Sequence, residues 1–172
     1  MDFFTSDHHF GHRRIIELNN RPFASIEEMD EALIERWNAV VGPDDVVYHL
    51  GDFSFGDQAN YLPRLNGKEK HLVIGNHDPK HSHPGWASVN DMLHIQSPDG
   101  TMLVLCHYAM RIWRYSHHGA IHLYGHSHGS LPGDSQSCDV GVDCWDFKPV
   151  SLDTIKAFLA QGKPRFEPDH HG

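Results

Sequence analysis

Short runs rich in Val, Ile, Leu and aromatic residues recur along the chain and predict β-strands. Six of these runs cover residues 2–5, 46–50, 71–74, 102–106, 121–124 and 139–142. Several runs are followed directly by polar residues. Ligand sites of α/β folds gather at the carboxyl ends of strands, so these polar residues are the first candidates for a functional site.

Two segments have the periodicity of helices. In residues 26–40, apolar side chains recur every three or four positions. Ser25 and Glu28 form a capping box at the start of this helix, and Gly42-Pro43 ends it. A second helix is predicted over residues 152–161. Strands that alternate with helices predict an α/β layered fold.

The length of 172 residues favours one domain, because domains usually have roughly 100–200 residues. We expect a domain over residues 1–162 and a C-terminal tail over 163–172. No apolar run approaches the roughly 20 residues of a membrane-spanning helix. The first residues are acidic rather than basic and include no long apolar segment, so we expect a cytoplasmic protein without a secretory signal.

The composition excludes some classes of site and partner. Cys106, Cys138 and Cys144 show no C-x-x-C pairing, which argues against a disulfide framework or a zinc ribbon. The formal net charge of −9 makes polymeric nucleic acid an unlikely partner and favours a small phosphorylated substrate. Histidine contributes 17 residues, more than packing requires, so its abundance needs a chemical explanation.

Five polar clusters follow predicted strands in chain order. They are Asp7-His8-His9, Gly51-Asp52, Gly75-Asn76-His77-Asp78, His107 and Gly125-His126-Ser127-His128. A carboxylate and an imidazole two residues apart can reach one cation, and a carboxylate has two oxygens with which to bridge two cations. Each cluster alone could be a turn or a set of surface residues. Only the complete series in this order indicates a functional site.

This series resembles the motifs D-x-H, G-D, G-N-H-D/E, H and G-H-x-H of the calcineurin-like metallophosphoesterase superfamily. The match runs from Asp7 to His128, about two-thirds of the chain. The resemblance implies a four-layer sandwich of two mixed β-sheets flanked by α-helices, as in small single-domain bacterial or phage-type phosphoesterases. It also implies metal-dependent hydrolysis of phosphate esters, with phosphodiesters of small, nucleotide-like molecules as the leading substrate class.

The resemblance further implies a site for two divalent metal ions. One ion would be held by Asp7, His9, Asp52 and His128. The other would be held by Asp52, Asn76, His107 and His126, which makes Asp52 the bridge. Imidazole, carboxylate and amide ligands without thiolate favour Mn, Fe or Zn, and the sequence does not choose among them.

In such a site a metal-bridging hydroxide attacks the phosphorus, and Asp52 and His77 are the expected catalytic residues. His77 would contact the phosphate and act as general acid. Many relatives carry Asp or His three residues after the bridging aspartate, but this chain has Phe55 there. Either another group, with Asp78 as a candidate, orients His77, or acid catalysis is weak and good leaving groups are preferred.

Arginines bind phosphate and aromatic rings stack on bases, so several residues are candidate substrate contacts. These are Arg13, Arg14, Arg111, Trp113, Arg114 and Tyr115. The alternative for each is a solvated charge or a packed ring. His8 and His12 are either supports for the ligands or exposed loop residues, and Asp139 and Asp143 are interpreted as supports or turn residues.

Two other functions stay open. The fold could be a metal-binding scaffold without turnover, or a nuclease that acts on polymeric nucleic acid. An assay of a phosphodiester and a phosphomonoester with Mn²⁺, with and without chelator, would separate an enzyme from a scaffold. The sequence leaves open the oligomeric state and the choice between monoester and diester.

Overall fold

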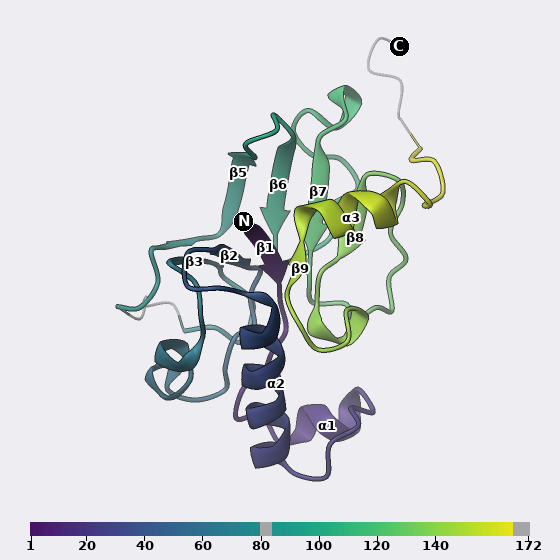
Figure 1. Cartoon of the computed structure of the whole chain (residues 1–172). Coiled ribbons are helices and arrows are strands. Elements are labelled where there is room, and N and C mark those ends of the chain that lie inside the picture. The colour runs from purple at the N-terminus through teal and green to yellow at the C-terminus, as the bar shows by residue number, and fades with distance from the viewer. Residues whose placement is uncertain (80–83, 167–172) are drawn as a thin grey trace.

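Two mixed β-sheets form the framework of the computed structural model, which describes residues 1–79 and 84–166 (Figure 1). The first sheet contains β1 (Asp2–Thr5), β2 (Val46–His49), β3 (Glu69–Val73), β4 (Ser88–Asn90) and β9 (Val150–Ser151). The second contains β5 (Met92–Gln96), β6 (Met102–Cys106), β7 (Ile121–Tyr124) and β8 (Ser137–Asp139). The strand orders are β4-β3-β2-β1-β9 and β5-β6-β7-β8, and in each sheet one edge strand, β9 or β5, is antiparallel.

The helices are short apart from one. The α-helices are α1 (Arg14–Leu18), α2 (Ile26–Val40) and α3 (Leu152–Leu159). The 3₁₀ helices are η1 (Gln58–Asn60), η2 (Leu62–Arg64), η3 (Ser116–His118) and η4 (Val142–Cys144). In the described part of the chain, no helix is both long enough and apolar enough to cross a membrane.

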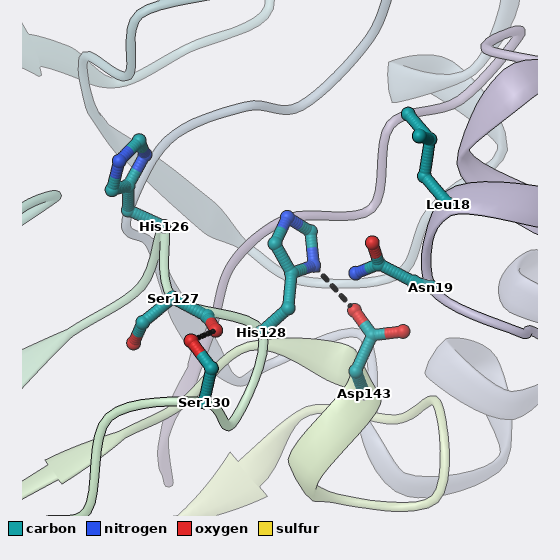
Figure 2. A pocket seen from close by; sticks show the side chains of 7 residues that line it. All are labelled: Leu18, Asn19, His126, Ser127, His128, Ser130 and Asp143. Atoms are coloured by element: carbon teal, nitrogen blue, oxygen red, sulfur yellow. Dashed lines mark hydrogen bonds and ion pairs between the residues drawn. The ribbon is translucent and has the colours of Figure 1, made fainter.

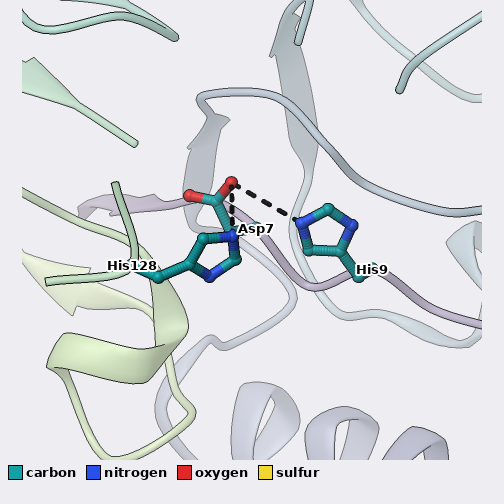
Figure 3. Close-up of side chains that lie close together, drawn as sticks. All are labelled: Asp7, His9 and His128. Carbon is teal, nitrogen blue, oxygen red and sulfur yellow. Dashed lines mark ion pairs between the residues drawn. The ribbon is translucent and has the colours of Figure 1, made fainter. Parts of the chain in front are cut away.

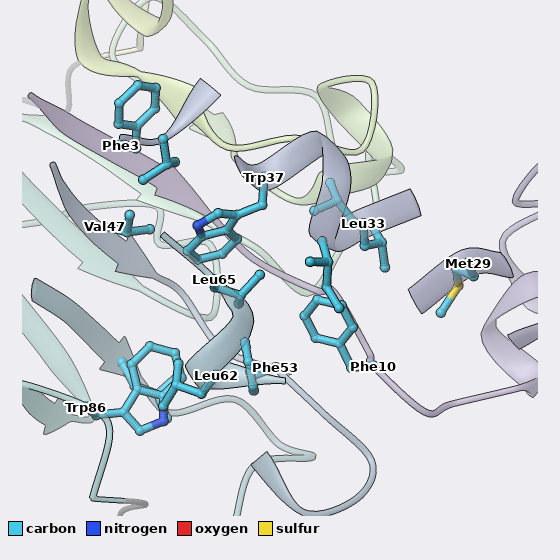
Figure 4. Close-up of a cluster of buried hydrophobic side chains, with 14 of the residues drawn as sticks. Phe3, Phe10, Met29, Leu33, Trp37, Val47, Phe53, Leu62, Leu65 and Trp86 are labelled. Atoms are coloured by element: carbon cyan, nitrogen blue, oxygen red, sulfur yellow. The ribbon is translucent and has the colours of Figure 1, made fainter. Parts of the chain in front are cut away.

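The long helix α2 covers the outer face of the first sheet. Its residues Leu33 and Trp37 are fully buried and pack in one cluster with Phe3 of β1 and Val47 of β2 (Figure 4). The indole nitrogen of Trp37 donates a hydrogen bond to the carbonyl of Asn66 at 2.9 Å. Burial of such a face stabilises a helix far more than its intrinsic propensity does.

A second core lies between the two sheets. Phe4 and Val73 of the first sheet pack with Leu103 and Leu123 of the second, and Ile155 of α3 joins the same cluster. The outer face of the second sheet is covered differently, by the irregular segment that leads into η3. The fold class expected from the sequence, α/β with two mixed sheets and flanking helices, is confirmed.

Most predicted boundaries are close to the observed ones. The predicted first helix is α2, with the Ser25 hydroxyl accepting a hydrogen bond from the Glu28 amide at 3.1 Å. The strand predicted over 139–142 is wrong in its bounds, because β8 ends at Asp139 and η4 begins at Val142. Val140 and Val142 are fully buried where β8 leads into η4, which explains why these positions are apolar without forming a strand. The short elements α1, β4, β5 and β9 were not predicted.

The predicted C-terminal tail makes contacts in its first residues. The Ser135 amide donates to the Lys163 carbonyl at 2.8 Å, and the Arg165 guanidinium lies 4.2 Å from the centre of the Trp113 ring. The rest of this segment, residues 167–172, lies outside the described residues.

Candidate metal centre

The loops that follow β1 and β2 stay paired beyond the sheet. The Asp7 amide donates to the Gly51 carbonyl and the His9 amide donates to the Asp52 carbonyl, each at 3.0 Å. This pairing places the first two polar clusters side by side. The carboxyl ends of the two strands therefore bring Asp7, His9 and Asp52 together, as the position of the clusters in the sequence predicted.

Five residues of this region have a left-handed backbone although none is glycine. They are Asp7, His9, Asp52, His126 and His128, with φ between 46° and 67°. Non-glycine residues in this conformation cost of order 1–3 kcal/mol each, and such strain concentrates at functional sites. All five belong to the seven predicted metal ligands.

Two glycines allow the polar clusters to approach closely. A Cβ at Gly51, where φ is 99°, would lie 2.5 Å from His107 Nδ1. A Cβ at Gly75 would lie 2.5 Å from the Asp52 amide nitrogen and would collide with the Asp52 carboxylate. The glycines of the second and third clusters are therefore required by close packing.

Asp7, His9 and His128 form the first candidate metal cluster (Figure 3). Asp7 Oδ1 lies 3.8 Å from His9 Nε2 and 4.0 Å from His128 Nε2. Asp7 Oδ1 and His9 Nε2 are buried without a hydrogen-bond partner among the described residues. Ligand atoms that share one ion lie roughly 3–4 Å apart, so a cation fits between these atoms and would satisfy both.

Asp52, His107 and His126 form the second cluster, and Asn76 lies beside it. His107 Nδ1 donates to the Leu50 carbonyl at 2.7 Å, so neutral His107 carries a lone pair on Nε2. His107 Nε2 lies 3.1 Å from Asn76 Oδ1, and both atoms are then hydrogen-bond acceptors. A cation between the two acceptors would turn their repulsion into coordination.

The Asp52 carboxylate joins the two clusters. Its Oδ2 lies 3.6 Å from His9 Nε2 and 3.6 Å from His107 Nε2, one residue from each cluster. Its Oδ1 accepts a hydrogen bond from the His77 amide at 2.9 Å, which fixes the plane of the carboxylate. The structure thus brings all seven predicted ligands together, in the two groups that the resemblance implied.

A buried arginine and an aspartate support the first cluster. His128 Nδ1 donates to Asp143 Oδ2 at 2.7 Å, which directs Nε2 toward Asp7. Arg21 makes a bidentate pair with Asp143 at 2.9 and 2.8 Å, and it also donates to the carbonyls of Asp7 and His8. Of the two interpretations of Asp143, support of a ligand or a turn residue, the hydrogen bond with His128 favours support. Arg21 was not predicted, and no motif around this single arginine could have revealed it.

Burial and neighbouring charges set the protonation of these groups. Burial raises the pKa of Asp7 to about 6, although the charge of His128 opposes the shift. Burial lowers the pKa of His9 to about 2, so this imidazole is neutral at neutral pH, as a metal ligand must be. Burial would raise the pKa of Asp143, but the hydrogen bonds from His128 and Arg21 outweigh burial and lower it to about 2.

His77 lies at the edge of the two clusters with an exposed side chain. Its ring is 5.5 Å from the ring of His9 and 5.4 Å from that of Phe55. The suggestion that Asp78 orients His77 is wrong, because the Asp78 carboxylate accepts from the backbone amides of Asp52, Phe53 and Gly75. Among the described residues, nothing hydrogen-bonds the His77 ring.

The remaining histidines near the site are of two kinds. His8 is fully buried, and its Nδ1 lies 2.9 Å from Nε2 of buried His49, so this pair belongs to the core. His12 is partly buried and stacks on Phe55 at 4.1 Å, with its ring 6.3 Å from that of His77. His12 therefore lies beside the candidate site, whereas His8 supports the loop from behind.

Trp113 is the clearest correction among the predicted substrate contacts. It is only 6% exposed and packs against Val104 and Ala120 on the outer face of the second sheet, with its Nε1 donating to the Ala120 carbonyl. A ring buried in this way cannot stack on a base. Tyr115 lies in the same covering segment, and the Arg114 guanidinium is 4.7 Å from its ring centre.

The predicted arginine contacts lie outside the two clusters. Arg13 and Arg14 are exposed at the start of α1, and Arg111 is exposed in the segment before η3, with its carbonyl accepting from Arg165. The structure records no contact between their side chains and the predicted ligands. A role for these arginines in substrate binding stays a prediction.

The fold and these two clusters define the protein as a two-sheet α/β protein with a candidate dinuclear metal centre. No family model matches the chain. The uncharacterized protein MJ1445 of Methanocaldococcus jannaschii is 31% identical to it, over 94% of this chain and 92% of that protein. The gene 66 protein of Mycobacterium phage L5 is 30% identical, over 89% of this chain and 91% of the phage protein. This chain belongs to the family of these proteins.

A solved structure has the same fold. The protein of unknown function AQ665 from Aquifex aeolicus superposes with a TM-score of 0.71 at 26% identity. The match covers 92% of this chain and 98% of that protein. The two-sheet architecture is therefore shared along nearly the full length of both proteins.

Proposed function

We propose that this protein is a dinuclear metal-dependent phosphoesterase of the calcineurin-like superfamily. The observation that carries the proposal is the position of Asp52 Oδ2, 3.6 Å from Nε2 of both His9 and His107. One carboxylate oxygen between two groups of ligands is what a pair of bridged cations requires. The resemblance of the ordered motifs supports the same assignment.

When bound, two cations at such a centre would activate water and neutralise the phosphoryl oxygens. The chain's own residues then have defined tasks. The hydrogen bonds from His107 Nδ1 and His128 Nδ1 hold each Nε2 toward its cluster. The amide of His77 holds the shared carboxylate. The donor set contains no thiolate, which favours Mn, Fe or Zn.

We assign His77 as the general acid that donates a proton to the leaving oxygen. It is the exposed histidine beside both clusters, and its ring lies at the open edge next to Phe55. Because no hydrogen bond to a described residue orients this ring, we expect the best turnover with leaving groups that need little protonation. Small phosphodiesters with an acidic leaving group are therefore the first substrates to test.

Metal binding tests the centre directly. Titration with Mn²⁺ by calorimetry should show two ions per chain, and Asp52→Asn should lose at least one of them. The control is Asp44→Asn, which makes the same substitution in an exposed turn. A wild-type chain that binds no divalent cation under any loading condition would sink the proposal.

Activity separates the enzyme from its alternatives. The Mn²⁺-loaded protein should hydrolyse bis(p-nitrophenyl) phosphate, and EDTA should abolish the reaction. Two bound ions without turnover of this diester or of p-nitrophenyl phosphate would favour the scaffold. Cleavage of single-stranded or duplex DNA that is faster than cleavage of the small diester would favour the nuclease.

A further inference from the structure

A cavity of about 540 Å³ opens next to the candidate metal centre (Figure 2). His126 and His128 form one wall, and each belongs to one of the two clusters. The opposite side is formed by Leu18 and Asn19, at the end of α1. A phosphate placed over the metal centre would therefore have one of its ester groups beside this cavity.

The described residues of the cavity lining offer no Lys or Arg to an anionic group. The only acidic residue in the lining is Asp143, and its charge is balanced by the bidentate pair with Arg21 and the hydrogen bond from His128. Beyond the metal centre, a second phosphate or a carboxylate would meet no cationic side chain in this lining, and an ammonium group would find no uncompensated negative charge.

The hydrogen-bonding groups of the cavity favour a ligand that can both donate and accept hydrogen bonds. Ser127 Oγ donates to Asp139 Oδ2 at 2.8 Å, and Ser130 Oγ donates to the Ser127 carbonyl at 2.6 Å. Both hydroxyl protons are committed, so toward a ligand these oxygens can only accept. Asn19, which lines the cavity, has a buried Nδ2 donor without a hydrogen-bond partner among the described residues. A neutral hydroxyl group satisfies both kinds of group, because it donates and accepts.

We propose that this cavity binds the neutral, hydroxyl-bearing part of the substrate, a sugar or another polyol, and that Ser130 and Asn19 are specificity-determining residues. The inference rests on the proposed phosphoesterase function and names the substrate class of that site. The exposed side chain of Leu18 provides an apolar wall against which the carbon skeleton of such a group can pack.

A matched pair of substrates tests the inference. Propyl p-nitrophenyl phosphate and 2,3-dihydroxypropyl p-nitrophenyl phosphate share the leaving group and differ in two hydroxyls. With Mn²⁺, kcat/KM should be about tenfold higher or more for the dihydroxypropyl ester, as one or two hydrogen bonds supply. Ser130→Ala and Asn19→Ala should each reduce this ratio severalfold. Ser135→Ala should keep it, because Ser135 lies in the same loop outside the cavity lining.

The outcomes are distinct. A wild-type ratio near one, an unchanged ratio in both cavity variants, or a preference for a 2-phosphoethyl ester would each overturn the inference. If neither the diesters nor p-nitrophenyl phosphate is hydrolysed, the phosphoesterase proposal fails. The cavity is then judged by calorimetry on the Mn²⁺-loaded protein, in which glycerol phosphate should bind more tightly than propyl phosphate and Ser130→Ala should remove the difference. Equal affinities would refute the assignment of the cavity.

Discussion

Replacing Arg21 with Met should both destabilise the protein and weaken metal binding at the first cluster. Arg21 is 4% exposed, and its guanidinium donates to Asp143, to the Asp7 carbonyl at 2.7 Å and to the His8 carbonyl at 2.9 Å. Met fills a similar volume but makes none of these hydrogen bonds. The substitution leaves a buried carboxylate without its charged partner and two carbonyls with one donor fewer.

The expected magnitude follows from these contacts. Removing one partner of a buried, hydrogen-bonded charge pair costs about 3–5 kcal/mol. This is a large share of the total stability of a domain, about 5–15 kcal/mol, and should be clear in urea unfolding followed by circular dichroism. Because Asp143 then holds His128 less firmly, Mn²⁺ affinity at the first cluster should fall about 10–100-fold.

Two comparisons make this prediction specific. Arg36→Met removes an exposed pair with Asp146 at 3.5 Å and should cost less than about 1 kcal/mol. Adding Asp143→Asn to Arg21→Met removes the unpaired charge and should recover part of the loss in stability. The reasoning is refuted if Arg21→Met unfolds within 1 kcal/mol of wild type, or if it binds Mn²⁺ as tightly.

Three further predictions address the site and its surroundings. For a diester with a basic alkoxide leaving group, which needs protonation, His77→Ala should lower kcat at least about 10²-fold without loss of bound metal. His94→Ala, exposed on β5, should leave kcat unchanged, and normal turnover of this diester by His77→Ala would exclude the acid role. Gly75→Ala should weaken Mn²⁺ binding at least tenfold, because its Cβ would collide with the Asp52 carboxylate. Gly56→Ala, whose Cβ meets open space, should keep the wild-type affinity, and equal affinities of the two variants would contradict this. Burial lowers the pKa of His122, so the stability that its neutral form gives the fold is complete above about pH 6.5 and is lost as pH falls. His122→Gln should therefore flatten the decline in unfolding free energy from pH 7 to 5. An unchanged slope would count against this role.

The sequence predicted the ligand clusters well because each lies at the end of a strand. Strand ends in a parallel arrangement meet at one edge, so residues as distant as Asp7 and Asp52 become neighbours through backbone pairing. The same reasoning fails for Trp113. Aromatic and arginine residues near a predicted site have no spacing rule that separates substrate contact from packing, and this ring is part of the core.

Support of the ligands could be predicted only in part. Asp143 lies in η4, shortly after β8, and support of a ligand was one of the two interpretations that its position in the sequence allowed. Arg21 lies 122 positions away in sequence and reaches Asp143 because the loop after α1 folds back against the loop after β1. Single side chains with long-range partners leave no periodic signal, so a chain without an alignment does not reveal them.

The left-handed residues connect the fold to the proposed function. Asp7, His9, Asp52, His126 and His128 all hold a backbone that L-amino acids disfavour, and in four of the five the side chain has an atom within 4.0 Å of another predicted ligand. An ordinary turn would relax this strain by substitution with Gly or Asn at no loss. Here Gly would remove the ligand and Asn would remove a charge or an imidazole. At these five positions, bound cations would be the partners that make the strained side chains useful.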